Sequence, residues 1–250
     1  MSNNNERTRA LVLNASKQIK NCIKKNTWIY DHMMNLHQKN GGALYLVIGG
    51  INTGKSKNIE CFVSYAVSKK FFKQLYIISP TIHANDRWLK AGFKKQGMLE
   101  VLLPEVLLQF IEQRKQMTQK ERDNNKVLMV LDDVLANPKS KVKGSEMIGL
   151  LSIVRHLGIF LIVISQEITG VPRILRSNNF GLFLHRQVGA KAIDIIYDEI
   201  ASGNENKQDF IKRYFNETAD KHFYFIDNYY EERKGERITV NKANPKFFGL

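Results

Sequence analysis

Cysteine and long apolar runs are both scarce in this sequence of 250 residues. The two cysteines, Cys22 and Cys61, are too few for a disulfide framework, which favours a reducing compartment. No apolar run approaches the roughly 18 residues that a membrane-spanning helix requires, and the first ten residues lack the apolar region of a signal peptide. We therefore expect a protein that is not secreted and has no membrane span.

Acidic residues are outnumbered, with 24 Asp and Glu against 38 Lys and Arg and a formal net charge of +14. This surplus favours contact with polyanions such as nucleic acid, although a charge that only aids solubility is the alternative. The six histidines and two cysteines show no zinc-ligand spacing, and no Ser-His-Asp nucleophile elbow occurs. Neither structural zinc nor a hydrolase triad is expected.

Short apolar segments alternate with helical patterns along the chain. Strands are predicted at 44–48, 74–80, 127–133, 159–165 and 180–186, and a strand, turn and strand at 222–240. Helices are predicted at 55–68, 104–118 (with a solvated polar tail) and 144–156. Continuous apolar strands of this kind are covered on both faces. The sequence therefore predicts an α/β fold, a P-loop NTPase with a mostly parallel central sheet flanked by helices on both faces.

Three regions are expected along the chain. Residues 1–40 read as a basic helical N-terminal extension, because apolar side chains share one helical face with lysines around it. Residues 41–215 form the predicted P-loop ATPase core. Residues 216–250 are predicted to form a C-terminal β-hairpin and tail that pack on the core.

The stretch VIGGINTGKS matches the Walker A pattern G-x-x-x-x-G-K-[ST], between a predicted strand and a predicted helix. In such a loop the glycines let backbone N–H groups approach phosphate at the positive end of a helix. Lys55 would reach the β- and γ-phosphates, and the Ser56 hydroxyl would coordinate Mg²⁺. A plain glycine-rich turn is the alternative. The expected nucleotide-binding residues are Gly49, Gly50, Ile51, Asn52, Thr53, Gly54, Lys55 and Ser56.

Two further strands end in polar residues that suit the same site. The strand VLMVLDD ends in Asp132 and Asp133, a Walker B pattern, and FLIVISQ ends in Ser165 and Gln166. Parallel strands deliver their carboxyl ends to one edge of a sheet, where ligands bind. Asp132 would thus meet the Mg²⁺, and Asp133 would orient or deprotonate water. Gln166 would hydrogen-bond the γ-phosphate or the water. The alternative for Asp132 and Asp133 is that they only cap the helix or turn that follows.

The segments GGINTGKS, VLMVLDDV and RHLGIFLIVISQEITGVPRILRSN together resemble one family. It comprises the genome-packaging ATPases of poxviruses, giant DNA viruses and virophages, a viral branch of the FtsK–HerA superfamily of ring-forming DNA translocases. The resemblance covers about residues 40–190. It implies ATP and Mg²⁺ as cofactors and a homo-oligomeric ring that pumps double-stranded DNA into a capsid. It further implies a capsid or portal-like viral partner, and a location in the host cytoplasm, a viral factory or the virion.

The resemblance also implies an arginine finger supplied by a neighbouring subunit, which is worth roughly 10³–10⁵ in rate. Arg155 and Arg176 are the candidates, and the sequence does not choose between them. Many relatives carry Glu at the place of Asp133, so the shorter side chain leaves its distance to water open.

Basic residues gather at 1–40, 69–95 and 139–144, and the last of these is a candidate pore loop. Lysine and arginine contacts to phosphate give the sequence-independent DNA binding that a translocase needs. Two rival functions use the same loop. One is a nucleoside or nucleotide kinase, which DNA would not stimulate; the other is a nucleotide-gated DNA-binding scaffold that does not turn over.

Overall fold

The computed structural model describes residues 26–84, 86–136, 145–201 and 206–228. Its centre is a seven-stranded sheet of order β3-β2-β4-β5-β1-β6-β7. All neighbouring strands are parallel except β7, which runs antiparallel to β6. The strands are β1 (Ala43–Ile48), β2 (Gln74–Ile78), β3 (Met98–Leu99), β4 (Val127–Asp132), β5 (Ile159–Ser165), β6 (Gly181–His185) and β7 (Phe223–Asp227).

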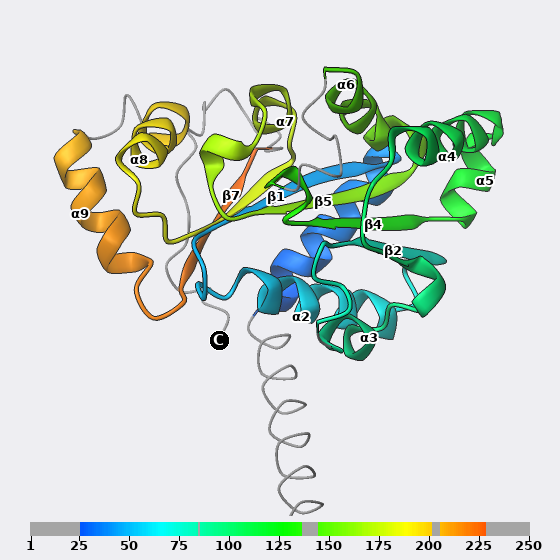
Figure 1. Ribbon diagram of the computed structural model, residues 1–250, viewed down its shortest axis with the longest axis horizontal. Helices are drawn as coiled ribbons and strands as arrows, with labels where there is room; N and C mark the ends of the chain where they lie inside the picture. The colour runs from blue at the N-terminus through cyan, green and yellow to red at the C-terminus, as the bar shows by residue number, and fades with distance from the viewer. Residues whose placement is uncertain (1–25, 85, 137–144, 202–205, 229–250) are drawn as a thin grey trace, which may run out of the picture.

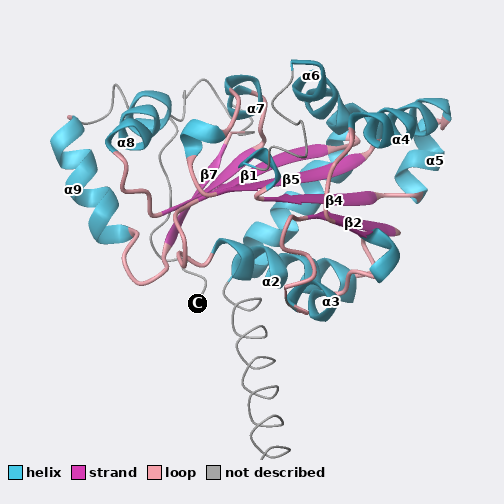
Figure 2. Cartoon of the chain, in the orientation of Figure 1, coloured by secondary structure: helices cyan, strands magenta, loops and turns pink. Residues whose placement is uncertain are grey.

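Helices cover both faces of this sheet (Figures 1 and 2). The helix over 26–40, α2 and α3 pack on one face, whereas α4, α6, α7, α8 and α9 contribute to the core on the other. The predicted fold class is therefore confirmed. The labelled helices are α2 (Lys55–Ser68), α3 (Arg87–Ala91), α4 (Pro104–Gln116), α5 (Gln119–Asn124), α6 (Ser145–Ile153), α7 (Arg173–Ser177), α8 (Ala190–Ile196) and α9 (Lys207–Glu217).

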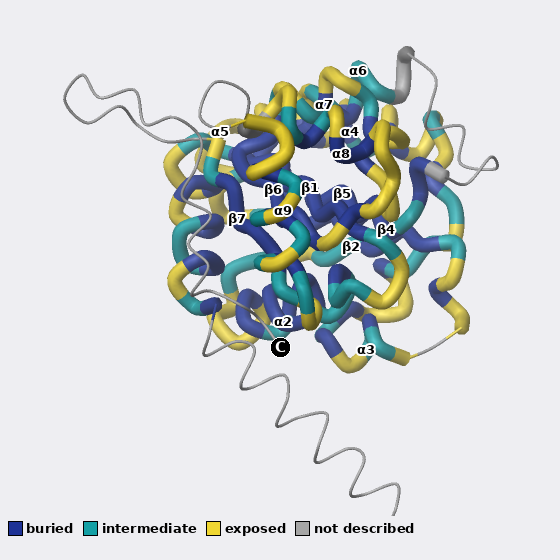
Figure 3. The backbone as a smooth tube through the Cα atoms, turned by 90° about the vertical axis from the view of Figure 1, so that its left-hand side faces the viewer, coloured by how far each residue is buried: buried dark blue, intermediate teal, exposed yellow. Residues whose placement is uncertain are grey.

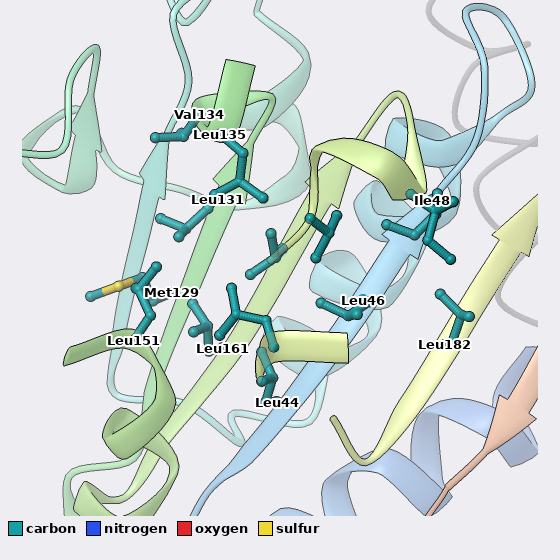
Figure 4. Packing of buried hydrophobic residues seen from close by; sticks show 14 of the residues in the cluster. Leu44, Leu46, Ile48, Met129, Leu131, Val134, Leu135, Leu151, Leu161 and Leu182 are labelled. Atoms are coloured by element: carbon teal, nitrogen blue, oxygen red, sulfur yellow. The ribbon is translucent and has the colours of Figure 1, made fainter. Parts of the chain in front are cut away.

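Each central strand supplies side chains to two separate apolar cores. In β1, Leu44 and Leu46 belong to the core under α4 and α6, whereas Tyr45 and Val47 belong to the core over α2. Figure 4 shows the first core from close by, and in Figure 3 the strands are buried while much of the helical surface is exposed. Successive side chains of a strand alternate between the two faces of the sheet. This double burial explains why the strands are continuously apolar.

The predicted helix at 104–118 is α4, which ends at Gln116, and a second helix, α5, lies within the predicted polar tail. Thr118 starts α5 with a capping box, in which its hydroxyl accepts from the backbone N–H of Glu121 while the Glu121 carboxylate accepts from the Thr118 backbone. The prediction of a solvated tail is wrong at Arg114, which is buried. Its guanidinium donates hydrogen bonds to the carbonyls of Leu157, Asn125 and Gly158. A long side chain with five donors can join two chain segments in this way, the end of α5 and the turn before β5.

Three predicted segments lie outside the described residues: 1–25 of the N-terminal extension, the basic segment 139–144 within the core, and the part of the C-terminal hairpin beyond 228. Within the described chain, residues 26–40 are helical, and Ile29, Tyr30 and Met33 pack in the same core as α2. The division into extension, core and C-terminal unit stays a prediction. No helix in the described ranges is long and apolar enough to cross a membrane.

Candidate nucleotide-binding site

Three strand ends lie side by side at one edge of the sheet. Strand β5 lies between β1 and β4, with Ile48 opposite Ser165 and Asp132 opposite Ile164. Because these strands are parallel, the loop after β1, the acidic pair after β4 and Gln166 after β5 emerge together. The structure thus brings together the sequence-predicted residues of the loop, the acidic pair and Gln166.

The loop at 49–54 joins β1 to α2 and requires glycine at two positions. A side chain at Gly49 would put its Cβ 2.4 Å from His185 Cβ and 2.7 Å from Thr53 Oγ1, closer than atoms pack. Gly54 has φ of 94°, a left-handed conformation that favours glycine, just before α2 begins. No side chain therefore covers the backbone at Gly54, directly before α2, and this geometry binds phosphate at a helix N-terminus.

Lys55, the first residue of α2, is buried with its ammonium directed into the loop. Lys55 Nζ donates a 2.8 Å hydrogen bond to the carbonyl of Gly50, which also accepts one of 2.8 Å from Thr53 Oγ1. Burial lowers the pKa of Lys55, while the carboxylates of Asp133 and Asp132 act in the opposite direction. The positive charge is thus positioned where the phosphate oxygens of a bound nucleotide would approach the loop.

Residues at the end of β6 contact the backbone of the loop, an arrangement that the sequence did not predict. His185 is buried, and its Nδ1 lies 2.8 Å from the carbonyl oxygen of Thr53. Burial lowers the pKa of His185 to about 3, so the ring is neutral near pH 7. A carbonyl oxygen only accepts, so Nδ1 carries the proton. The backbone N–H of Gly50 donates to the carbonyl of Arg186 (3.0 Å). In the sequence, the only sign of this role is that His185 stands near the end of an apolar predicted strand.

Asp132, the last residue of β4, is buried and makes two polar contacts through one oxygen. Its Oδ2 lies 3.0 Å from Nη2 of Arg87 and accepts a 3.2 Å hydrogen bond from the Ser79 hydroxyl. Burial raises the pKa of the Asp132 carboxyl, and the Arg87 charge opposes this. The sequence placed Arg87 only within the basic stretch 69–95. Its contact with the acidic pair depends on β2 lying beside β4.

Asp133 and Gln166 form a direct pair. Gln166 Nε2 donates a 3.0 Å hydrogen bond to Asp133 Oδ2, while Asp133 Oδ1 is buried with no hydrogen-bond partner among the described residues. Asp133 has φ of 55°, a left-handed conformation, and its N–H donates to the carbonyl of Ile164 (3.1 Å). Asp tolerates this conformation better than longer residues. The turn therefore directs the second carboxylate toward the β5 end.

A buried glutamine fixes the segment that carries Gln166. Gln187 donates from Nε2 to the carbonyl of Gln166 (2.8 Å) and accepts from the N–H of Ile168 (3.3 Å). The hydroxyl of Tyr214, on α9, donates to the carbonyl of His185 and accepts from the N–H of Gln187, both at 2.8 Å. Helix α9 is thus linked to the ends of both β5 and β6. These positioning residues were not predicted from the sequence.

The predicted arginine-finger candidates lie in different settings. Arg176, on α7, binds both carboxylate oxygens of Glu199 and the carbonyl of Val171. Arg155 lies in the 3₁₀ turn before β5, and its side chain is outside what the structure describes. A finger acts on the neighbouring subunit, so the role of either arginine stays a prediction.

The donor set fits Mg²⁺ and a phosphate chain. Ser56 offers a hydroxyl in the first turn of α2, and Asp132 and Asp133 offer carboxylate oxygens, one of them buried without a described partner. Mg²⁺ prefers such oxygen ligands and usually takes one or two carboxylates together with substrate phosphates and water. In the described part of the chain no group of three or more His, Cys, Asp or Glu side chains is placed to bind a metal. Phosphate oxygens and water would complete the coordination.

This arrangement defines a P-loop NTPase: β5 lies between β1 and β4, and the phosphate-binding loop, the acidic pair and Gln166 follow the ends of these three strands. The chain belongs to the poxvirus A32 protein family, whose model matches residues 35–214. The resemblance to the poxvirus branch of the viral genome-packaging ATPases is thereby confirmed. No curated protein matches this chain.

Solved structures share the fold at low sequence identity. The genome-packaging NTPase B204 of Sulfolobus turreted icosahedral virus 2, in complex with AMP, has a TM-score of 0.56 and 14% identity over 75% of this chain and 93% of its own. B204 of Sulfolobus turreted icosahedral virus, described as a DNA-packaging ATPase, has a TM-score of 0.53 and 13% identity over 74% and 90%. The pCW3 conjugation coupling protein TcpA has a TM-score of 0.51 and 13% identity over 76% and 58%.

Proposed function

We propose that this chain is a Mg²⁺-dependent ATPase that acts as one subunit of a homo-oligomeric ring and moves double-stranded DNA into a viral capsid. The observation that carries the proposal is the Gln166–Asp133 hydrogen bond, which lies at the same sheet edge as the phosphate loop. Such a pair suits hydrolysis, because an amide can hold a carboxylate in position to orient and deprotonate water.

Each predicted residue has a role in this proposal. The loop amides and Lys55 bind the β- and γ-phosphates, and Ser56 and Asp132 hold Mg²⁺. A bound Mg²⁺ would neutralise charge on the phosphates. Asp133 takes the proton of the attacking water, and Gln166 keeps the Asp133 carboxylate aimed at that water.

The translocase role is supported by family and charge. The B204 proteins are described as genome-packaging enzymes, and TcpA as a conjugation coupling protein. The formal charge of +14 suits a partner that carries phosphate along its whole length. A finger from the neighbouring subunit, Arg155 or Arg176, would complete each site in the ring. A capsid or portal-like protein would anchor the ring, in the host cytoplasm, a viral factory or the virion.

The test is ATP hydrolysis by the full chain with and without duplex DNA, over a salt series, together with the solution mass. Salt-sensitive stimulation by DNA and a mass of several subunits are the expected results. The matched control is Lys55→Ala, which should abolish turnover. Turnover that DNA does not affect would favour a kinase, and DNA binding without turnover would favour a scaffold; either result overturns the proposal.

A further inference from the structure

Arg87 bonds to the carboxylate that is proposed to hold Mg²⁺. Its Nη2 lies 3.0 Å from Asp132 Oδ2, and the side chains of Arg87 and Asp132 are 31% and 4% exposed. The pair is therefore partly shielded from solvent, where charges interact more strongly than on an open surface. Ser79 donates to the same oxygen. Arg87 thus satisfies and neutralises Asp132 in the nucleotide-free chain.

Arg87 is also the first residue of α3, a short helix that packs beside α2. The other end of α3 packs on α2, where Ser64 Oγ lies 3.5 Å from the carbonyl oxygen of Ala91 and Gly92 approaches Val67. Trp88, which follows Arg87, is almost fully buried. The first residue of α3 therefore contacts Asp132 at the nucleotide site, whereas the last residue of α3 contacts α2.

Exposed lysines lie on α3 and on the chain segments near its ends. Lys90 lies on α3, Lys94 and Lys95 follow it, and Lys69 and Lys70 follow the end of α2; all five are exposed. These side chains are part of the basic stretch 69–95. A shift of α3 would consequently move positive charge on the surface that the sequence marks for DNA.

We propose that Arg87 is a positioning residue that ties α3 to Asp132 in the absence of Mg-nucleotide and is released when Mg-nucleotide binds. The Arg87 guanidinium and Mg²⁺ would compete for the buried Asp132 carboxylate, because two positive charges that contact the same carboxylate repel each other. The release couples the ATP site to the lysines of the α3 segment. By linkage, DNA that draws α3 away from Asp132 favours Mg-nucleotide binding to the same degree. The inference rests on the proposed function.

Trp88 supplies a built-in probe, because the Arg87 guanidinium carbon lies 5.2 Å from its ring centre. The chain has two tryptophans, so Trp28→Phe leaves Trp88 as the only one. Emission from this full-length variant is recorded with Mg²⁺ alone, with AMPPCP in EDTA, and with both Mg²⁺ and AMPPCP. The emission should change with the two together and much less with either alone. If Mg²⁺ with AMPPCP binds by calorimetry but leaves the emission unchanged, the inference is wrong.

Substitutions at Arg87 then test the competition itself. In Arg87→Gln the Mg²⁺ concentration for half-maximal AMPPCP binding should fall about 5- to 10-fold, the lower range of allosteric coupling, and the Trp88 change should disappear. Arg87→Lys, which keeps the charge, should restore the parent Mg²⁺ dependence, and the matched control Lys115→Gln, which removes an exposed charge on α4 instead, should leave it unchanged. Equal Mg²⁺ dependence in Arg87→Gln and the parent would overturn the inference.

The two proposals fail in different ways. A parent chain that gives no heat with AMPPCP, with or without Mg²⁺, contradicts the proposed function and the inference together. A parent chain that binds AMPPCP and hydrolyses ATP, while Arg87→Gln keeps its Mg²⁺ dependence and its Trp88 signal, contradicts only the inference.

Discussion

The side-chain amide of Gln166 donates a 3.0 Å hydrogen bond to the carboxylate of Asp133, although the two residues are 33 positions apart in sequence. They meet because β5 and β4 are adjacent and parallel, so that both residues follow strand ends at one edge. The other carboxylate oxygen of Asp133 has no hydrogen-bond partner among the described residues. This oxygen is buried with its hydrogen-bonding capacity unused among the described residues, and the proposed reaction assigns it to the attacking water.

The left-handed backbone at Asp133 predicts that Glu is a poor replacement. Asp133→Glu should lower the free energy of unfolding by about 1 kcal/mol, because longer residues adopt φ of 55° less readily. It should also lower kcat by displacing the carboxylate. Urea unfolding and steady-state ATPase assays measure both effects. Asp133→Asn is the matched control for stability, since Asn tolerates this conformation; equal stability of the Glu and parent proteins would contradict the prediction.

Adjacent glycines of the loop should respond differently to a methyl group. A Cβ at position 49 would lie 2.4 Å from His185 Cβ, whereas at position 50 the nearest atom, the Arg186 carbonyl oxygen, is 3.5 Å away. Gly49→Ala should therefore destabilise the fold by about 1–3 kcal/mol, the range for an overpacked core, and weaken ATP binding. Gly50→Ala should cost much less. Thermal unfolding and calorimetry compare the two, and similar losses would show that the contact with His185 does not matter.

The buried histidine under the loop predicts a pH-dependent stability. Burial lowers the pKa of His185 to about 3 from an ordinary value of 6.5. Between these values the unfolded chain binds a proton at this residue and the folded chain does not, so stability falls as the pH drops below 6.5. The loss approaches about 1.4 kcal/mol per pH unit for this group.

Urea unfolding at several pH values between about 5 and 6, above the ordinary carboxylate range, measures this slope. His185→Gln should show a shallower slope than the parent, even if its stability is lower at every pH. His37, whose pKa burial also lowers to about 3, is present in both proteins and cancels in the comparison. Parallel slopes would mean that His185 is protonated in the folded chain.

The network behind Gln166 predicts a loss of turnover without a loss of nucleotide binding. Gln187→Ala removes the hydrogen bond to the Gln166 carbonyl and leaves the loop untouched. We expect kcat to fall about tenfold or more, because small misplacements of catalytic groups are costly, while the Kd for AMPPCP stays near the parent value. Gln113→Ala, on the exposed face of α4, is the control. A Kd that rises as much as kcat falls would indicate a general loss of structure.

The sequence predicted the residues whose spacing is local and missed those whose role depends on the order of strands. The loop, Asp132, Asp133 and Gln166 each follow a strongly apolar strand, and parallel strands share one ligand-binding edge. Arg87 reaches Asp132 only because β2 lies beside β4. His185 and Gln187 reach the loop and Gln166 because β6 lies beside β1. Strand order cannot be read from apolar runs alone.

Whether a polar residue is buried was also not predictable from its neighbours in the sequence. Arg114 belongs to a run of polar residues that has the composition of a solvated surface, yet it is enclosed by carbonyl groups. Helix α3 and the two-residue strand β3 are too short to give a periodic signal.

The most direct test of the central claim is a double-mutant cycle on ATP hydrolysis at positions 133 and 166. If Asp133 and Gln166 act as one unit, Asp133→Asn and Gln166→Ala should each reduce kcat, the former by on the order of 10²-fold or more. The double variant should then be no slower than Asp133→Asn alone. Independent, multiplying losses would contradict the account, and so would a parent chain that does not hydrolyse ATP.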